Sequence, residues 1–370
     1  MKKKVVKALS IVEYDNPPIV RGKHKFLYEE FNNKKMHSLR GKYKLDKVIA
    51  SGKTEFKKML LLRDWVSSRF NHGYCKRYKG ETALDVLKRA EKGECFTCAT
   101  FASVLVSCLT SLGFVARNLT IAQDETDFIG NNTNIGHCVA EVWSNQFRKW
   151  IVLDADTKAH FEKDEMPLSA YEVRKYWLEG KWKEVDFIQA KNPPKVVTMG
   201  SDFKEEQLEK NIKNFMKHNT MNYYHHIMVN MGNNRFSKKK YPITLNWVDE
   251  YCCPQIVRQN VAVDPSKRKH TDNIKDIYYT LNQAHISLSC HRASKGIPVP
   301  VLEVNIETET PWFDYFMVCI DKDNWRKRPE RFTWRLKEGK NTIEAKPVNK
   351  FCREGVISKI SVILREGDDE

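Results

Sequence analysis

The sequence lacks an apolar run that approaches the roughly 20 residues needed to cross a bilayer. It also has no internal repeat and no low-complexity tract. Hydrophobic residues make up 41% and aromatic residues 11%, a globular composition in a chain long enough for two or three domains. The segment MKKKVVKALSIVEYDNPP has the positive flank of a secretory signal, but Lys7 and Glu13 interrupt its apolar stretch. We therefore expect it to be mature sequence.

Cysteine is too sparse for a disulfide framework, since ten cysteines are spread over 370 residues. Cys108, Cys138 and Cys319 fall within apolar patterns, where a free cysteine packs as a small hydrophobe. This favours a reducing compartment and a cytoplasmic location. A secreted or periplasmic location is the alternative if a signal has been removed.

Positive charge is in excess, but the basic residues form no long run. Lys and Arg outnumber Asp and Glu by 63 to 47, which gives a net charge of +16 and favours acidic partners in general. The basic clusters are short, and the sequence has no basic helix or aromatic–basic ladder typical of nucleic-acid modules. A solvated basic surface is the simpler interpretation.

Helical periodicity dominates the first third of the chain. Residues 53–69 and 81–93 place apolar side chains at helical spacing. Two adjacent apolar stripes over residues 95–112 predict a third helix that is buried on most of its circumference. Cys95 lies on one stripe, and Cys98 lies on the other.

A β-hairpin is predicted after this helix. Residues 137–143 and 148–154 read as strands separated by SNQF. If residues 143 and 148 face each other across this loop, the same register places His137 opposite Asp154. Directly opposed residues have Cβ atoms about 5 Å apart on one face of the sheet.

The chain divides into four predicted parts. Pro193–Pro194 marks one boundary, and short alternating strands separated by turn residues begin at Ala284. We expect the following division: an N-terminal arm or cap (1–50), a catalytic core (51–195), a helical or irregular extension (196–280) and a C-terminal β-sandwich (281–370).

Cys95 has the sequence context of an activated thiol. A cysteine is a good nucleophile as a thiolate, and a helix N-terminus or an imidazolium lowers its pKa. Cys95 begins the predicted buried helix directly after Gly93-Glu94, and free N–H groups there can stabilise an oxyanion. His137 is a candidate base and acid, oriented by Asp154. Sequence physics alone does not bring Cys95 to His137.

The segment GECFTCATFASVLVSCLTSLGFVAR resembles the transglutaminase-like superfamily. IGHCVAEVW and WIVLDAD resemble the histidine and aspartate strands of that family, and the resemblance covers about residues 55–160. One departure is Val139, where the family often has an aromatic residue. The positions that match the family's cysteine motif are Gly93, Cys95, Ala99, Leu112-Gly113 and Arg117.

The resemblance implies an α+β fold: a papain-like core, with a cysteine helix on an antiparallel sheet that carries the histidine and aspartate. The predicted all-β immunoglobulin-like sandwich follows this core. The resemblance also implies that a tryptophan upstream of the cysteine assists the oxyanion. Trp65 is the candidate, although its helical pattern equally fits a core position.

Metal and redox chemistry is the alternative for the CxxC formed by Cys95 and Cys98. There is no second CxxC, so we expect no metal and no cofactor, and Cys98 is assigned to the core stripe. Asp156 shares the strand face of Asp154, but the register and the family position both select Asp154. His218, His225 and His226 lack ligand partners at suitable spacing and are read as structural or solvated. These last three residues form no predicted site.

The predicted function is amide chemistry by a Cys95–His137–Asp154 triad through a thioester, as a protease, amidase or transglutaminase-like acyltransferase. The substrate would be a protein or peptide, with or without glycosylation. Glycanase action is disfavoured because paired CxxC zinc ligands are absent. The alternative is a non-catalytic protein- or glycan-binding member of the same fold. Its binding candidates, which also fit core positions, are Trp312, Trp325 and Trp334.

Overall fold

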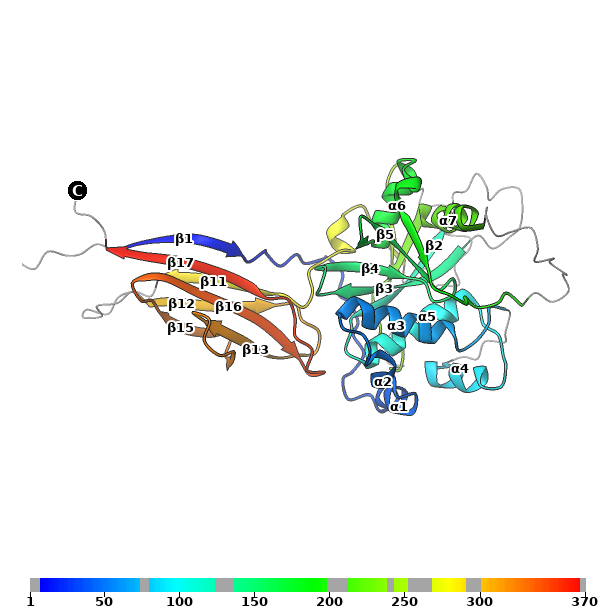
Figure 1. Ribbon diagram of the computed structural model, residues 1–370, viewed down its shortest axis with the longest axis horizontal. Coiled ribbons are helices and arrows are strands. Elements are labelled where there is room, and N and C mark those ends of the chain that lie inside the picture. Colours follow the sequence, from blue (N-terminus) through cyan, green and yellow to red (C-terminus); the bar gives the residue numbers. More distant parts are fainter. Residues whose placement is uncertain are drawn as a thin grey trace, which may run out of the picture. The chain divides into compact units, whose positions relative to one another are not determined.

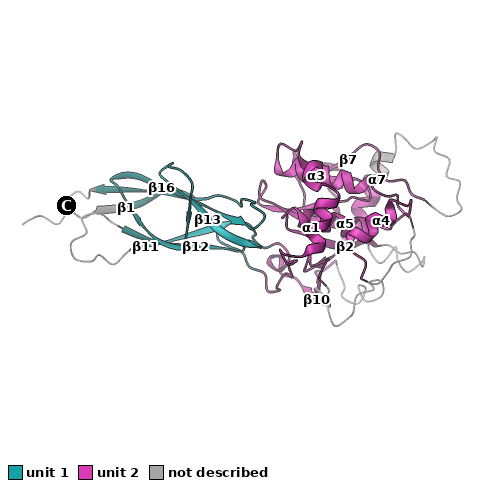
Figure 2. Ribbon diagram, turned by 90° about the horizontal axis from the view of Figure 1, so that it is seen from below, with its two compact units in different colours: residues 1–21, 279–370 teal, residues 22–278 magenta. Residues whose placement is uncertain are grey.

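The computed structural model describes residues 7–73, 80–123, 136–197, 212–237, 243–251, 268–290 and 301–366. The chain forms two compact units, and the first combines residues 1–21 with residues 279–370. The second unit comprises residues 22–278 (Figure 2). Cys75, Cys252 and Cys253 lie outside the described residues.

Three helices of the unit 22–278 lie where helical periodicity predicts them, with one shift. The third predicted helix begins at Cys98 and not at Cys95. None of the helices in the described ranges is long and apolar enough to span a membrane. The helices are α1 (Lys34–Lys42), α2 (Leu45–Ile49), α3 (Glu55–Ser67), α4 (Ala83–Ala90), α5 (Cys98–Ser111), α6 (Ala170–Leu178) and α7 (Ile212–Asn222).

A six-stranded sheet supports these helices in the order β10-β9-β8-β2-β3-β4 (Figure 1). Its strands are β2 (Ala116–Ala122), β3 (Gly136–Ser144), β4 (Lys149–Leu153), β8 (His226–Asn230), β9 (Thr244–Trp247) and β10 (Arg268–Thr271). A smaller sheet contains β5 (Ala159–Lys163), β6 (Met166–Pro167) and β7 (Asp186–Gln189).

The α5 helix packs on one face of the large sheet, against β2 and β3. The buried residues of α5 run from Phe101 to Ser111 without a break except Ser103, as its two apolar stripes predict. Ser103 accepts a 3.2 Å hydrogen bond from the amide of Asn118 on β2. Burial of each large apolar side chain contributes roughly 1.5–3 kcal/mol, so the helix is held firmly on the strands.

The β3–β4 hairpin differs from the predicted register by two residues. Ser144 pairs with Lys149 and Trp143 with Trp150, so the predicted opposition of residues 143 and 148 is wrong. The four-residue turn lies one position later, at 145–148, and Arg148 has φ 53°. A register shift of two residues leaves each side chain on the same face of the sheet, because side chains alternate between the two faces along a strand. His137 and Asp154 therefore remain on one face of the sheet as predicted, but as diagonal neighbours and not as directly opposed residues.

The other unit consists of antiparallel strands in two sheets, ordered β1-β17-β16-β13-β14 and β11-β12-β15. Both sheets contribute to one hydrophobic core that includes Trp334, Ile343 and Val304. The strands are β1 (Lys7–Asp15), β11 (Ala284–Cys290), β12 (Val301–Thr308), β13 (Phe313–Ile320), β14 (Arg326–Arg328), β15 (Arg331–Arg335), β16 (Gly339–Asn349) and β17 (Ser358–Glu366).

The predicted N-terminal arm is divided between the two units. Strand β1 pairs with β17 at the edge of the five-stranded sheet, whereas α1 and α2 belong to the other unit. Leu9, Ile11 and Tyr14 are exposed, so β1 lacks the clean alternation of a half-buried strand. This explains why the sequence pattern did not reveal β1.

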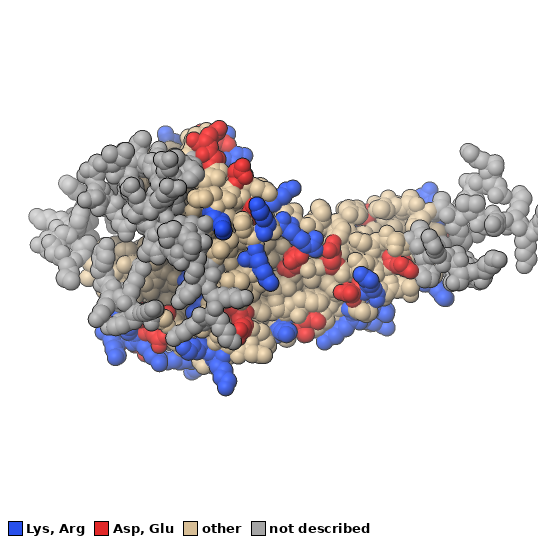
Figure 3. Space-filling model, turned by 180° about the vertical axis from the view of Figure 1, so that it is seen from behind, with Lys and Arg blue, Asp and Glu red and all other residues tan. Residues whose placement is uncertain are grey.

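The charged residues are interspersed on the face that Figure 3 shows. Groups of Lys and Arg lie among Asp and Glu there. Many basic side chains are paired at the surface, as in the Arg40–Asp46 and Lys181–Glu179 ion pairs. The described surface of this face thus carries its positive charge in small groups.

Candidate active site

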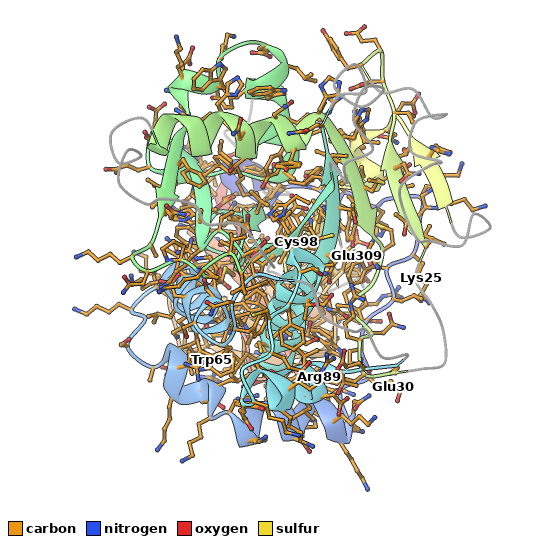
Figure 4. All side chains as sticks on the ribbon, turned by 90° about the vertical axis from the view of Figure 1, so that its right-hand side faces the viewer. Lys25, Glu30, Trp65, Arg89, Cys98 and Glu309 are labelled. Atoms are coloured by element: carbon orange, nitrogen blue, oxygen red, sulfur yellow. The ribbon has the colours of Figure 1, made fainter. Side chains whose placement is uncertain are left out.

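The first turn of α5 carries a partly exposed cysteine, Cys98. Thr97 precedes it in extended conformation as the N-cap residue. The N–H groups of a first helical turn have no partners within the helix, and the helix dipole places partial positive charge there. Figure 4 shows Cys98 at one end of the α5 ribbon. The helix N-terminus that the sequence predicts at Cys95 therefore acts on Cys98.

His137, near the start of β3, is held by Asp154. The Nε2 atom of His137 lies 2.8 Å from Oδ2 of Asp154. Asp154 also accepts hydrogen bonds from the backbone N–H groups of Asp156 and Thr157 and from the Thr157 hydroxyl. Burial alone would raise the pKa of Asp154, but the charge and hydrogen bond of His137, with those of Thr157, keep it below its usual value. Asp154 is therefore an anion.

His137 also lies beside Cys98, with one of its ring nitrogens within 4.8 Å of the Cys98 sulphur. Because Asp154 occupies Nε2, the nitrogen that remains for Cys98 is Nδ1. Burial lowers the pKa of His137, but Asp154 and Cys98 raise it more, to well above its usual value. The arrangement favours an imidazolium beside the cysteine.

A second cysteine, Cys138, contacts the first. The pKa of the Cys98 thiol is raised well above its usual value by a hydrogen bond with Cys138 and by burial, and the hydrogen bond and charge of His137 offset this only in part. Cys138 also lies 3.7 Å from the Thr120 hydroxyl on β2. Formation of a Cys98 thiolate consequently depends on His137.

A second histidine–carboxylate pair flanks the first. His72 Nδ1 lies 2.8 Å from Asp156, and this hydrogen bond raises the pKa of His72. One ligand atom each of Cys98, His137 and Asp156 lie within 4.8 Å of one another, a grouping that zinc also uses. His137 and Asp156 already have hydrogen-bonding partners, which fits a site for proton transfer.

Cys95 lies before the helix, in a segment that pairs with residues 71–73. Phe96 donates its N–H to Asn71 and accepts from Gly73, and a Cβ at Gly73 would come 2.8 Å from the Cβ of Cys95. In the described ranges no contact joins Cys95 to His137, so its role as nucleophile stays a prediction. The assignment of Cys98 to the core is wrong, because Cys98 is partly exposed and its sulphur lies within 4.8 Å of a ring nitrogen of His137.

Two features of the sequence indicate Cys98 as the start of the helix. Ala102 follows Cys98 by four residues, just as Ala99 follows Cys95. Thr97 is of a residue type that commonly caps a helix N-terminus, and it places the helix start at Cys98.

The aromatic residues Tyr223 and Trp65 differ in their relation to the candidate site. Tyr223, which the sequence gave no reason to select, packs against His137 with ring centroids 5.7 Å apart and the rings tilted by 44°. Trp65 on α3 contacts Tyr43 edge-to-face and lies under the Arg69 guanidinium. Figure 4 shows Trp65 well separated from Cys98. Its predicted oxyanion role thus has no supporting contact in the described structure.

Residues 43–155 match the family model described as Transglutaminase-like superfamily, and this part of the chain is a transglutaminase-like domain. The matched range contains α3, α4 and α5, the strand β3 that carries His137, and Asp154 directly after β4. No curated protein matches the sequence.

Two solved structures show weak similarity. One is a proposed cysteine protease from Cytophaga hutchinsonii, with 15% identity and a TM-score of 0.27 over 50% of this chain and 58% of that chain. The chain thus spans less than two thirds of that protein. The other is red sea bream transglutaminase, with 11% identity and a TM-score of 0.25 over 91% of this chain and 73% of that chain. Scores this low do not establish a shared overall fold.

Proposed function

We propose that the unit 22–278 is a thiol enzyme that transfers acyl groups from amides, with Cys98 as its nucleophile. The observation that carries this proposal is the chain of contacts from Cys98 through His137 to Asp154. It joins a thiol at a helix N-terminus to an imidazole whose far nitrogen is fixed by a carboxylate. Cys98 therefore takes the role that the sequence predicted for Cys95.

In the first half of the proposed reaction, His137 accepts the Cys98 proton, and the thiolate sulphur attacks the amide carbon. N–H groups at the start of α5 stabilise the oxyanion. The tetrahedral intermediate collapses as the C–N bond breaks, and His137 gives its proton to the leaving amine. The products are a free amine and a thioester on Cys98.

In the second half, water or an amine attacks the thioester. His137 removes a proton from the attacking group and returns it to the Cys98 sulphur, which leaves. Asp154 stays ionised throughout and holds the imidazole in position. Hydrolysis of a peptide or side-chain amide is the first expectation, and transfer to a lysine amine is the alternative with the same intermediate.

We further propose that the catalytic unit has a papain-like arrangement and that the strand-rich unit is an immunoglobulin-like sandwich. A helix that carries the proposed nucleophile and packs on the antiparallel strands β2 and β3 supports the first assignment. Two antiparallel sheets around one core support the second. The sandwich would serve as a support or as an accessory binding domain.

Mapping of iodoacetamide labelling tests the proposed nucleophile. At neutral pH we expect Cys98 to react faster than the other nine cysteines, as read by mass spectrometry of peptides after short pulses. Cys98→Ala should abolish the fast phase, and the matched variant Cys95→Ala should keep it. Fast labelling at Cys95, or no fast phase at all, would show that the assignment is wrong.

A second assay separates hydrolysis from transfer. The protein is incubated with a glutamine-containing peptide, with and without a fluorescent primary amine. Release of ammonia without incorporation of the amine indicates hydrolysis, whereas a fluorescent peptide indicates transfer. Either product should disappear in Cys98→Ala and persist in Cys95→Ala.

A further inference from the structure

A second carboxylate lies beside the proposed nucleophile and takes no part in the proposed triad. One oxygen of Asp156, the Cys98 sulphur and a ring nitrogen of His137 lie within 4.8 Å of one another. The Asp156 side chain is 7% exposed, and its backbone N–H donates to Asp154 over 2.9 Å, so one turn fixes both carboxylates. Like charges this close repel each other, so an unpaired Asp156 carboxylate would disfavour the Cys98 thiolate.

His72 is the partner of Asp156. The Nδ1 atom of His72 lies 2.9 Å from Oδ1 and 2.8 Å from Oδ2 of Asp156, so a single N–H is shared by both oxygens. In the described part of the chain, no other side chain hydrogen-bonds this carboxylate. The hydrogen bond raises the pKa of His72, which favours its imidazolium form. The positive charge of His72 therefore faces the carboxylate beside the thiol.

Backbone hydrogen bonds on both sides of His72 hold this pair in place. His72 donates its N–H to the Lys195 carbonyl over 2.9 Å, and its own carbonyl accepts the Val197 N–H over 2.8 Å. His72 also forms a bridge to Phe96, two residues before Cys98. The His72 side chain is 33% exposed, so the pair extends from a buried carboxylate toward solvent. The imidazole is thus fixed next to the segment that leads into the nucleophile.

The charge of His72 responds to the groups that carry out the proposed reaction. The titratable side chains on the elements around it are those of Asp156, Cys98, His137, Cys95 and Lys195. The first two raise the pKa of His72, whereas burial and the charge of His137 lower it. Lys195 is exposed, so solvent screens its charge.

We propose that His72 is a positioning residue that neutralises Asp156 and so allows the Cys98 thiolate to form. The inference rests on the proposed function of Cys98. In this arrangement His137 supplies a positive charge at the sulphur, and His72 cancels a negative one. Loss of the His72 charge alone leaves a carboxylate facing the sulphur, whereas loss of both charges does not. A single and a double variant should therefore behave differently.

The pH dependence of Cys98 alkylation by iodoacetamide tests this inference. EDTA is present throughout, because Cys98, His137 and Asp156 can also group around a metal ion. His72→Asn keeps an N–H donor near the position of Nδ1 but carries no charge. The midpoint of its profile should move up by about one pH unit, and its rate at neutral pH should fall roughly tenfold, because the thiol ionises beside an unpaired carboxylate.

The double variant His72→Asn/Asp156→Asn distinguishes an electrostatic role from a structural one. With both charges gone, its midpoint and rate should return to those of Asp156→Asn. His270→Asn changes an exposed histidine of the same unit and is the matched control, expected to behave as wild type. A wild-type profile in His72→Asn would overturn the inference, as would a double variant as slow as His72→Asn. Slow alkylation of Cys98 in wild type at every pH would instead overturn the proposed function.

Thermal unfolding of the same variants shows whether a slow rate reflects loss of folded protein. His72→Asn keeps the backbone hydrogen bonds to Lys195 and Val197, and in the double variant two amides can bond to each other. Both variants should therefore be folded at the assay temperature. Rates that only follow the folded fraction of each variant would assign the pair to the scaffold and overturn the inference.

Discussion

The imidazole of His137 is oriented by Asp154 through Nε2, with 2.8 Å between Nε2 and Oδ2, and a ring nitrogen of His137 lies within 4.8 Å of the Cys98 sulphur. Asp154→Asn keeps the shape of this side chain but removes its charge. The pKa of His137 should fall, and the imidazolium that favours the Cys98 thiolate should be lost. We expect the rate of Cys98 alkylation at neutral pH, and any amide turnover, to fall by about 10² to 10⁴.

Asp156→Asn is the matched control for this change. Asp156 lies two residues further along and bonds to His72 instead of His137. Its effect on alkylation should be less than about tenfold, because the His137–Asp154 hydrogen bond remains. If Asp156→Asn were the more damaging variant, the orienting role would belong to Asp156.

The contact between Cys98 and Cys138 predicts that loss of Cys138 lowers the pKa of Cys98. The hydrogen bond with Cys138 is the largest influence that raises the pKa of Cys98, so Cys138→Ala should lower this pKa. The midpoint of the pH dependence of iodoacetamide alkylation should move to lower pH. His137→Asn should move it to higher pH, because the charge that lowers the Cys98 pKa is gone. An unchanged midpoint in Cys138→Ala would mean that the two thiols are not coupled.

The sequence predicted the elements of the active site better than their exact boundaries. The helix, the hairpin and the partnership of His137 with Asp154 follow from periodicities of 3.6 and 2 and from face alternation. The helix starts three residues later than predicted, at Cys98 instead of Cys95, and our proposed nucleophile shifts with it. Local patterns do not resolve such a shift.

Local sequence patterns could not predict the contacts that come from distant segments of the chain. Tyr223 contacts His137 from a segment more than a hundred residues after Cys98, directly before β8, which pairs with β2 in the sheet order β8-β2-β3. Strand β1 joins the C-terminal sheet across the whole chain. Pairings of this kind depend on the tertiary fold, and a single sequence does not show them.

Arg117, which matched the family pattern, has a structural explanation that can be tested by unfolding. It is fully buried, forms an ion pair with Glu141 at 2.7 Å and stacks on Trp150. Arg117→Leu would leave the Glu141 carboxylate buried without its cation, so the free energy of unfolding should fall by about 3–5 kcal/mol. Urea denaturation monitored by tryptophan fluorescence measures this change.

Two further variants control the Arg117 prediction. Arg326→Leu breaks an exposed ion pair with Asp323 and should cost about 1 kcal/mol or less. The double variant Arg117→Leu/Glu141→Leu should recover part of the lost stability, because no unpaired charge remains. If the double variant were as unstable as the sum of the two single variants, the pair would not be coupled.

The lowered pKa of His160 predicts how the stability of the unit 22–278 depends on pH. Burial and the charge of Arg63 lower the pKa of His160 to about 3. Neutral His160 accepts a 2.9 Å hydrogen bond from Arg63 at Nδ1 and donates to Glu162 from Nε2. In the unfolded chain the histidine pKa is about 6.5, so below this pH the unfolded state binds a proton that the folded state does not. Stability from this group is complete above about pH 6.5 and is lost as the pH falls toward 3.

His160→Gln tests this account, because an amide can keep both hydrogen bonds but does not titrate. Between pH 6.5 and pH 5 the wild-type free energy of unfolding should fall by about 1.4 kcal/mol per pH unit from this residue, and the variant should lack this slope. His270→Gln replaces an exposed histidine in the same unit and serves as the control for loss of a histidine. Urea denaturation at pH 7, 6 and 5 gives the three slopes. Parallel slopes for wild type and His160→Gln would show that His160 is protonated in the folded protein.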